Sequence, residues 1–86
     1  MQIYEVEFKP SALKEIKKLP KHISLRILKA INKLSTNPRV GNVRPMVGVK
    51  SWRLKVGEYR AIYDIRDNKL TVLIIRVRHR KDVYGN

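Results

Sequence analysis

Basic side chains recur at alternate positions in the segment WRLKVGEYRAIYDI, residues 52–65. Successive side chains of a β-strand point to opposite faces, so we expect Arg53, Lys55 and Arg60 on one face of a β-hairpin. Arginine and lysine bind phosphates, and they stabilise the negative charge that builds on a phosphorus centre during phosphoryl transfer. The spacing therefore predicts one of three things: a solvated sheet face, a phosphate-binding patch or the working face of an enzyme.

RNA is a phosphate ester that such residues can cut without a metal, because its 2′-hydroxyl is a built-in nucleophile. An enzyme must orient this hydroxyl in line, help to remove its proton and protonate the departing 5′-oxygen. Clustered cations depress one another's pKa, so a lysine among arginines can act as a base near neutral pH. Arginine serves better as a fixed electrostatic clamp. A tyrosine such as Tyr84 can stack on a base or donate a hydrogen bond.

Other chemistries lack the residues that they need. The chain has no cysteine, and His22 and His79 are far apart with no paired carboxylates beside them, so we expect no metal site and no cofactor. The serines have no plausible partnership with a histidine and an aspartate, which argues against a hydrolase triad. GVKS at 48–51 lacks the earlier glycine and the following helix of a phosphate-binding loop.

Charge is the strongest compositional signal. The 86 residues include 20 Lys and Arg against 7 Asp and Glu, a formal net charge of +13. We expect one small domain over residues 1–86, and a surface that meets a polyanion or an acidic protein. An inert basic surface is the alternative. No apolar run approaches the length of a membrane span, and the first residues do not form a secretion signal, so we expect a cytoplasmic protein.

The hydrophobic patterning predicts an α+β fold of order β-α-α-β-β-β. Period-two alternation predicts a strand over residues 2–8. Helical spacing predicts one helix from Pro10 to Leu19 and a second over about 21–34, while 38–49 is expected to be a loop. Strands are then expected over residues 50–56, 59–66 and 69–78. Two amphipathic helices require an apolar surface to cover, so we expect both N-terminal helices on one face of a small, mostly antiparallel sheet.

The polar alternates of these strands should share the other sheet face. Six arginines and lysines qualify, namely Arg53, Lys55, Arg60, Arg76, Arg78 and Arg80. We expect Arg60 and Arg80 to face solvent, so that their replacement by alanine leaves the fold intact. Tyr59 and Tyr63 alternate with the cations and should lie in the core. Asp67-Asn68 is predicted to form a tight hairpin turn, and Gly57-Glu58 is a weaker candidate.

The motif WRLKVGEYRAIYDI, followed after an apolar strand by RVRHRKDVY, resembles the RelE/ParE superfamily of toxins from toxin–antitoxin pairs, and most closely its RelE branch. The resemblance covers about the whole chain. It implies two N-terminal helices packed on a mostly antiparallel sheet. For the RelE branch it implies a ribosome-dependent mRNA endonuclease, which enters the ribosomal A site and cuts the codon there through the 2′-hydroxyl, without metal.

The resemblance also implies roles for individual residues. Lys55 is expected to be the general base, Arg60 to hold the phosphate, Arg80 to assist the leaving oxygen and Tyr84 to stack or orient. RNA binding is assigned to further basic residues of the same strands and tail, namely Arg53, Arg76, Arg78, His79 and Lys81. Arg53 stands where the best-known pattern has lysine, and Arg78 stands where a glycine often occurs.

The expected partners follow from the same resemblance. They are a cognate RelB-like antitoxin with an acidic segment, the ribosome with its mRNA, and operator DNA reached only through the antitoxin. Two other functions stay open. One is a ParE-like inhibitor of DNA gyrase that performs no RNA chemistry. The other is a non-catalytic basic domain that binds nucleic acid or an antitoxin.

Overall fold

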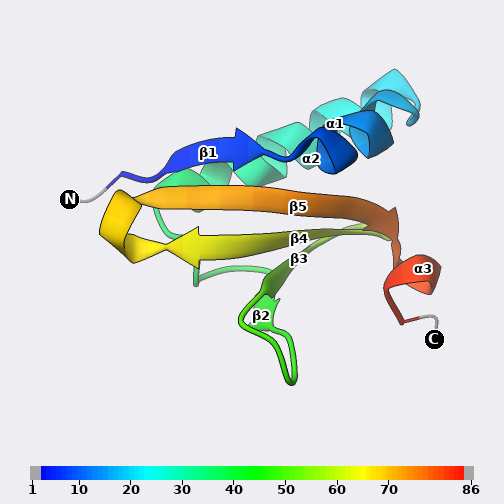
Figure 1. The fold of residues 1–86 in the computed structure, drawn as a ribbon. Helices are drawn as coiled ribbons and strands as arrows, with labels where there is room; N and C mark the ends of the chain where they lie inside the picture. The colour runs from blue at the N-terminus through cyan, green and yellow to red at the C-terminus, as the bar shows by residue number, and fades with distance from the viewer. Residues whose placement is uncertain (1–2, 85–86) are drawn as a thin grey trace.

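The computed structural model describes residues 3–84, in which two helices lie against a sheet and a third lies at one end (Figure 1). The elements are β1 (Glu5–Phe8), α1 (Pro10–Lys17), α2 (Lys21–Asn32), β2 (Val43–Pro45), β3 (Trp52–Val56), β4 (Tyr59–Arg66), β5 (Thr71–His79) and α3 (Arg80–Tyr84), with 3₁₀ turns at Lys33–Ser35 and Asp67–Lys69. The predicted order of long elements is confirmed. The short strand β2 and the short helix α3 were not predicted.

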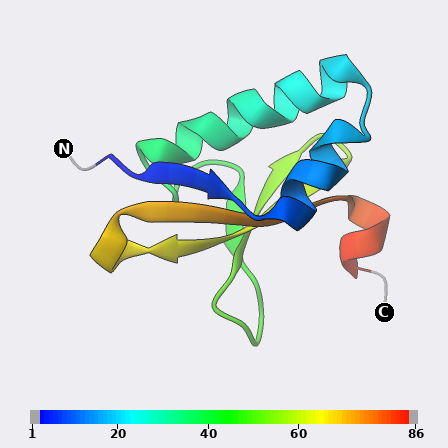
Figure 2. The same ribbon diagram turned by 45° about the horizontal axis from the view of Figure 1, so that its top comes forward.

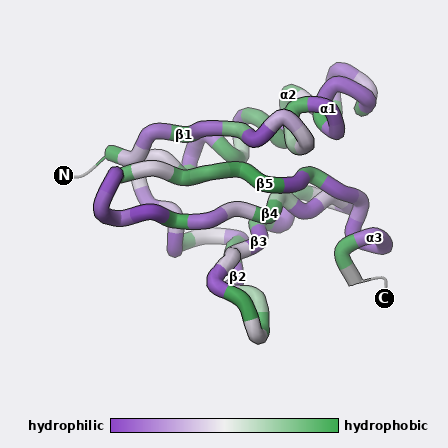
Figure 3. The backbone as a smooth tube through the Cα atoms, in the orientation of Figure 1, coloured by the Kyte–Doolittle hydropathy of each residue, from purple (hydrophilic) through white to green (hydrophobic). Residues whose placement is uncertain are grey.

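The five strands form one sheet in the order β1-β5-β4-β3-β2. β1 runs parallel to β5, and the other neighbouring strands are antiparallel, so the predicted, mostly antiparallel α+β fold is confirmed. β5 lies between two strands, as its nearly continuous apolar run predicts. Figure 3 shows this hydrophobic stretch in the middle of β5 and mostly hydrophilic residues toward its end near α3.

Helices α1 and α2 lie together over one face of the sheet (Figure 2). Pro10 occupies the first turn of α1, where its missing N–H would have no helical partner, and Pro20 separates the two helices. Their apolar stripes meet the strands in a core whose fully buried members include Ala12, Ile27, Ile31, Tyr63, Val72 and Ile74. None of the helices within residues 3–84 is long and apolar enough to span a membrane.

The two turns that connect β3, β4 and β5 differ in length from the prediction. The tight turn is the one at Gly57-Glu58, and the wider one is at Asp67-Asn68. Gly57 and Glu58 alone connect β3 to β4, because Val56 pairs directly with Tyr59. Gly57 adopts φ +58°, a left-handed conformation that glycine reaches without a steric penalty. The tight turn predicted at Asp67-Asn68 is wrong. Residues 67–70 form a wider loop there, because a 3₁₀ turn precedes the first paired residue of β5.

A β-bulge in β5 decides which face its arginines occupy. Tyr63 pairs with Ile74, whereas its neighbour Ile62 pairs with Arg76, so that Ile75 is the extra residue. Without the bulge, simple alternation would put Arg76 on the same face as the buried Ile74, underneath the helices. The extra residue re-aims the rest of the strand. Arg76 and, two residues later, Arg78 therefore lie on the face opposite the helices.

Candidate active site

The sheet face opposite the helices gathers cations from four strands. Directly paired residues of an antiparallel ladder point to the same face. Lys55 pairs with Arg60, which pairs in turn with Arg78. Arg53 lies two residues before Lys55 and pairs with Arg44 of β2. The alternation in the sequence therefore identified five cations of this face correctly. It missed Arg44, and it wrongly included Arg80, which begins α3 after β5 has ended.

A cavity of about 430 Å³ opens on this face, and we call it the cationic pocket. It is lined by Gly41, Asn42, Val43, Arg44, Arg53, Lys55 and Arg60. Four of these residues are cationic and, among the residues that the structure describes, no carboxylate joins them in the lining. A concave site lined by charge of one sign concentrates ligands of the opposite sign. The pocket is therefore suited to an anion such as a phosphate diester.

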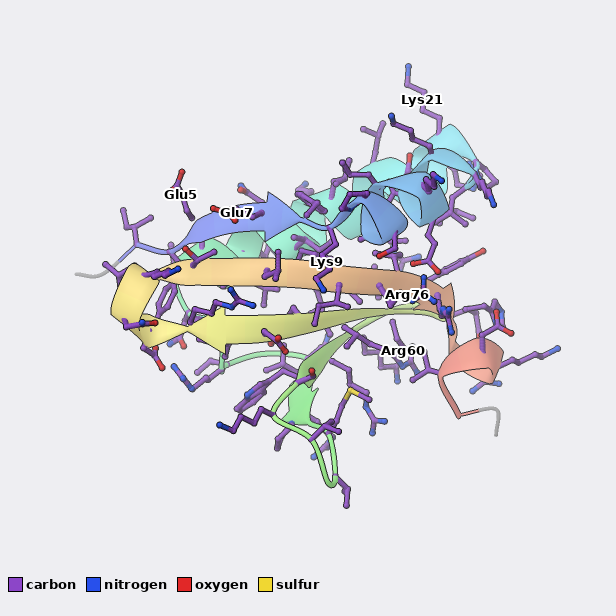
Figure 4. All side chains as sticks on the ribbon, viewed as in Figure 1. Glu5, Glu7, Lys9, Lys21, Arg60 and Arg76 are labelled. Carbon is purple, nitrogen blue, oxygen red and sulfur yellow. The ribbon has the colours of Figure 1, made fainter. Side chains whose placement is uncertain are left out.

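Arg60 is buried, with 7% of its surface exposed, so the prediction that it faces solvent is wrong. Its Nη1 donates to the carbonyl oxygens of Gly57 and Tyr59, at 2.9 Å each. The guanidinium therefore folds back over its own hairpin turn. Alternation gives the face of the sheet on which a side chain lies, and it does not give its depth. Figure 4 shows Arg60 and Arg76 toward the same end of the sheet, near α3.

The wall of the pocket formed by residues 41–44 is attached to the sheet through its main chain. The Lys55 amide donates to the carbonyl of Asn42 at 2.8 Å. Further along, the buried Tyr63 hydroxyl donates to the Pro38 carbonyl at 2.6 Å, and burial raises the pKa of Tyr63 above its ordinary value. A core residue of β4 thus anchors the chain just before the segment that supplies Arg44.

An ion pair at the other end of the sheet holds the same segment. Arg39 donates from Nη1 and Nη2 to the two carboxylate oxygens of Asp67, at 3.3 and 2.7 Å. The Tyr4 hydroxyl also donates to Asp67, at 2.6 Å. These hydrogen bonds, first that of Arg39 and then that of Tyr4, hold the pKa of the Asp67 carboxyl below its usual value. They connect residue 39 to the loop before β5 and, through Asp67, to Tyr4 immediately before β1.

Arg76 and Arg78 lie on the face of the cationic pocket but outside its lining. Both reach Glu15 of α1: the Nε of Arg78 is 3.1 Å from Glu15 Oε2, and the Nη1 of Arg76 is 3.6 Å from the same oxygen. Arg78 is adjacent to the pocket, because its direct cross-strand partner is Arg60. The structure therefore places these two arginines beside the pocket, held from the edge of the sheet.

Arg80 begins α3 and pairs with the carboxylate of Glu58, with 2.8 Å between Arg80 Nε and Glu58 Oε2. Its amide donates to the Glu58 carbonyl at 2.7 Å, so Arg80 lies beside the Gly57-Glu58 turn. Its side chain is 54% exposed, as predicted, but Arg80 does not line the cationic pocket. Tyr84 ends α3, and its side chain lies outside the part of the chain that the structure describes.

His79 and Lys81 do not join the cationic pocket. His79 pairs with Tyr59, so it lies on the helix-covered face of β5, and its ring contacts that of Tyr59 edge to face, with 5.4 Å between centroids. Both His79 and Lys81 line a different cavity of about 670 Å³, which also includes Lys18 of α1. The sequence grouped His79 with the RNA-binding arginines. The structure places His79 on the opposite face of β5 from these arginines, because consecutive residues of one strand point to opposite faces. Arg78 nevertheless also lines this second cavity, together with Glu15.

The sequence of this chain matches a known protein family and individual proteins of known type. The family model described as the ParE toxin of the type II toxin–antitoxin system parDE matches residues 6–84. This chain belongs to the RelE/ParE superfamily of type II toxins. Toxin RelG of Mycobacterium tuberculosis is 40% identical over 85 residues, which cover 94% of this chain and 95% of RelG. The mRNA interferase toxin RelE of Escherichia coli is 31% identical over 86 residues, covering 95% of this chain and 90% of that toxin.

A solved structure gives the same result for the fold. The toxin–antitoxin complex RelBE2 from M. tuberculosis contains a chain that matches this one with a TM-score of 0.81 and 32% identity, over 91% of this chain and 99% of that chain. The RelE-like toxin described above therefore has the fold that its sequence motif predicted. Within residues 3–84 of this toxin, no group of three or more His, Cys, Asp or Glu residues could hold a metal ion.

Arg44 and Asn42 of the toxin's pocket were not predicted from the sequence. Both lie in a segment that contains Pro38, Gly41 and Pro45, a composition typical of a loop. β2 comprises only residues 43–45 and is an edge strand, so it has too few residues to show alternation. The one local signal was the position of Arg44 between Val43 and Pro45, and its pairing with Arg53 became visible only in the folded chain.

Proposed function

We propose that this toxin is a ribosome-dependent, metal-independent mRNA endonuclease that acts in the cytoplasm and cuts codons in the ribosomal A site. The observation that supports this most is the convergence of Arg44, Arg53, Lys55 and Arg60 on one concave pocket without a carboxylate in its described lining. A phosphate diester of the message fits such a site in charge. A related toxin is named an mRNA interferase, which supports RNA as the substrate class.

The proposed reaction is an internal transfer of the phosphate. The 2′-oxygen of one nucleotide forms a bond to the adjacent phosphorus while the bond from phosphorus to the 5′-oxygen breaks. The products carry a 2′,3′-cyclic phosphate on one fragment and a 5′-hydroxyl on the other. The proton of the 2′-hydroxyl goes to a base, and a proton is delivered to the departing 5′-oxygen, so no metal, oxidant or cofactor is required.

Lys55 is our candidate for the base, because its neutral amine can accept a proton whereas the neighbouring arginines remain charged. Arg60 is the candidate for stabilising charge on the phosphate oxygens. Its hydrogen bonds to the Gly57 and Tyr59 carbonyls fix the guanidinium before the substrate arrives, which is the condition for electrostatic stabilisation of a transition state. Arg44 and Arg53 would bind the flanking phosphates.

Arg80 and Tyr84 are proposed to complete the site from α3. For Arg80 to assist the leaving oxygen, the phosphate must compete with Glu58 for its guanidinium, because the pair is formed in the structure. That pair is solvent-exposed, and exposed pairs contribute only about 0–1 kcal/mol. An incoming phosphate can therefore displace Glu58 at low cost. The partner that restrains the toxin is proposed to be a RelB-like antitoxin, whose acidic residues would complement a net charge of +13.

The experiment is primer extension on a defined message, with and without translating ribosomes. The endonuclease proposal predicts stops inside A-site codons that require both the toxin and the ribosome, and that disappear with Lys55→Ala. A matched control is Lys33→Ala, which removes an exposed lysine of the 3₁₀ turn after α2 that does not line the pocket. A message that stays intact in every reaction would refute the proposal.

A second function has support from one observation, since the family model that matches residues 6–84 is named for ParE. A ParE-like activity would inhibit DNA gyrase and would need no RNA chemistry. Supercoiling of relaxed plasmid by purified gyrase separates the two. We expect no inhibition at toxin concentrations that cut ribosome-bound message. Inhibition of supercoiling together with an intact message would replace the first proposal with the second.

A further inference from the structure

Glu15 of α1 lies at the edge of β5, beyond the point where β5 pairs with β1. β1 pairs with β5 only as far as Ile74. Beyond that point α1 supplies the hydrogen bonds that a strand would have made. The Ser11 hydroxyl donates to the Ile75 carbonyl at 2.9 Å, and the Val77 amide donates to Glu15 Oε1 at 2.9 Å. Spaced four residues apart, Ser11 and Glu15 lie on one face of the helix.

The second oxygen of the same carboxylate serves the cationic face. Glu15 Oε2 accepts from Arg78 Nε at 3.1 Å and lies 3.6 Å from Arg76 Nη1. Glu15 is the only acidic residue between Glu7 and Glu58, in a stretch that is otherwise rich in lysine and arginine. A lone carboxylate that contacts two arginines of another element does more than satisfy one backbone amide.

The contact orients Arg78 without occupying all of its donors. Glu15 takes the Nε–H of the guanidinium, and among the described residues Arg78 makes no other side-chain hydrogen bond. The terminal nitrogens keep four N–H donors in a planar fork that matches phosphate geometry. Since Arg60 is the direct cross-strand partner of Arg78, the main chain of Arg78 lies one strand away from the cationic pocket. Arg78 itself lines the neighbouring cavity of about 670 Å³, together with Glu15.

We propose that Glu15 is a positioning residue for RNA binding. Its carboxylate fixes Arg78, and more loosely Arg76, on the cationic face, so that Arg78 meets a phosphate next to the one in the pocket. The inference rests on the proposed function for the identity of the ligand. Glu15 acts on affinity for the message through Arg78, and it does not take part in the bond-breaking step.

The test is a double-mutant cycle between Glu15→Gln and Arg78→Ala. Glutamine keeps an oxygen that can accept the Val77 amide, so the edge of β5 stays satisfied while the charge that holds Arg78 is removed. The control is Glu7→Gln, which removes the same charge from an exposed side chain of β1 (Figure 4). For each variant we would measure the maximal cleavage rate on programmed ribosomes, the toxin concentration that gives half of it, and the Tm.

The proposal predicts that Glu15→Gln raises the half-maximal concentration by about tenfold, a factor equal to about 1.4 kcal/mol, with the maximal rate unchanged. In the Arg78→Ala background the same change should have less than about a twofold effect, because nothing is left to orient. Glu7→Gln should match the unaltered toxin. Equal effects of Glu15→Gln in both backgrounds, or an effect that follows the loss of Tm, would show a purely structural role and overturn the proposal.

A binding measurement separates this inference from the proposed function. Fluorescence anisotropy with a short RNA that carries 2′-O-methyl groups needs neither cleavage nor ribosomes, and the same cycle can be measured on its Kd. A toxin that leaves the message intact but shows the coupling on Kd would refute the endonuclease proposal and retain the role of Glu15. Cleavage without coupling in either assay would refute the role of Glu15 alone, and a toxin that neither cuts nor binds RNA would refute both.

Discussion

Replacement of Arg60 by alanine should lower the stability of this toxin as well as its activity. The substitution removes two hydrogen bonds from a charged donor to the carbonyls of Gly57 and Tyr59. Such bonds contribute about 1.5 kcal/mol each at the lower end of their range. Removing a cation that is only 7% exposed, with no carboxylate among its described partners, offsets part of this loss. We therefore expect a net loss of about 2 kcal/mol.

Urea denaturation measures this loss directly, and a thermal scan should show it as a fall in Tm of about 8–16 °C for a protein of this size. Arg44→Ala is the matched control. Arg44 lines the same pocket, but its side chain is exposed, so its removal should change stability by less than about 0.5 kcal/mol. Both variants should cut ribosome-bound message more slowly than the unaltered toxin.

Unfolding of Arg60→Ala at the same urea concentration as the unaltered protein would refute this reasoning. That result would mean that the guanidinium lies in solvent, as the simple alternation of the sequence suggests, and that its contacts with the turn contribute nothing. A large loss of stability in Arg44→Ala would be equally damaging, because it would give the pocket wall a structural role that its exposure does not support.

Three further predictions concern the supports of the site. Tyr63→Phe should cost about 1–2 kcal/mol in urea denaturation, because it leaves the carbonyl of Pro38 without its buried donor. Gly57→Ala should cost about 1 kcal/mol in the same assay, because alanine is strained at φ +58°. Asp67 has a pKa lowered by Arg39, so its ion pair stabilises the fold above the unfolded pKa of about 3.9. The stability difference between the unaltered toxin and Asp67→Asn should therefore hold at neutral pH and vanish as the pH falls through the lowered pKa.

The sequence predicted the features that depend on local spacing. Alternation identified β1, β3, β4 and β5, and it correctly put Tyr63 in the core and Arg53 and Lys55 on the opposite face. Helical spacing and two prolines located α1 and α2. These predictions work because side-chain direction within a regular element is fixed by its period. They give the face on which a residue lies, and so they identified three of the four cations that line the cationic pocket.

The remaining features depend on contacts between distant segments. Glu15 and Val77 are 62 residues apart when they bond, and Arg44 enters the pocket only by pairing with Arg53. The bulge at Ile75 reverses the alternation of β5, and no residue in that apolar run signals its position. The burial of Arg60 arises from the turn that precedes it. Period alone cannot supply any of these, because each needs the register between two elements.

The most direct test of the central claim is the fate of the 2′-hydroxyl. Two messages would be compared on ribosomes stalled at one codon, one unmodified and one with a 2′-O-methyl group on the nucleotide before the cut. The proposed chemistry predicts cleavage of the first alone, with a 2′,3′-cyclic phosphate on its upstream fragment, and no cleavage with Lys55→Ala. Cleavage of the methylated message at a similar rate, or an upstream fragment with a free 3′-hydroxyl, would contradict it.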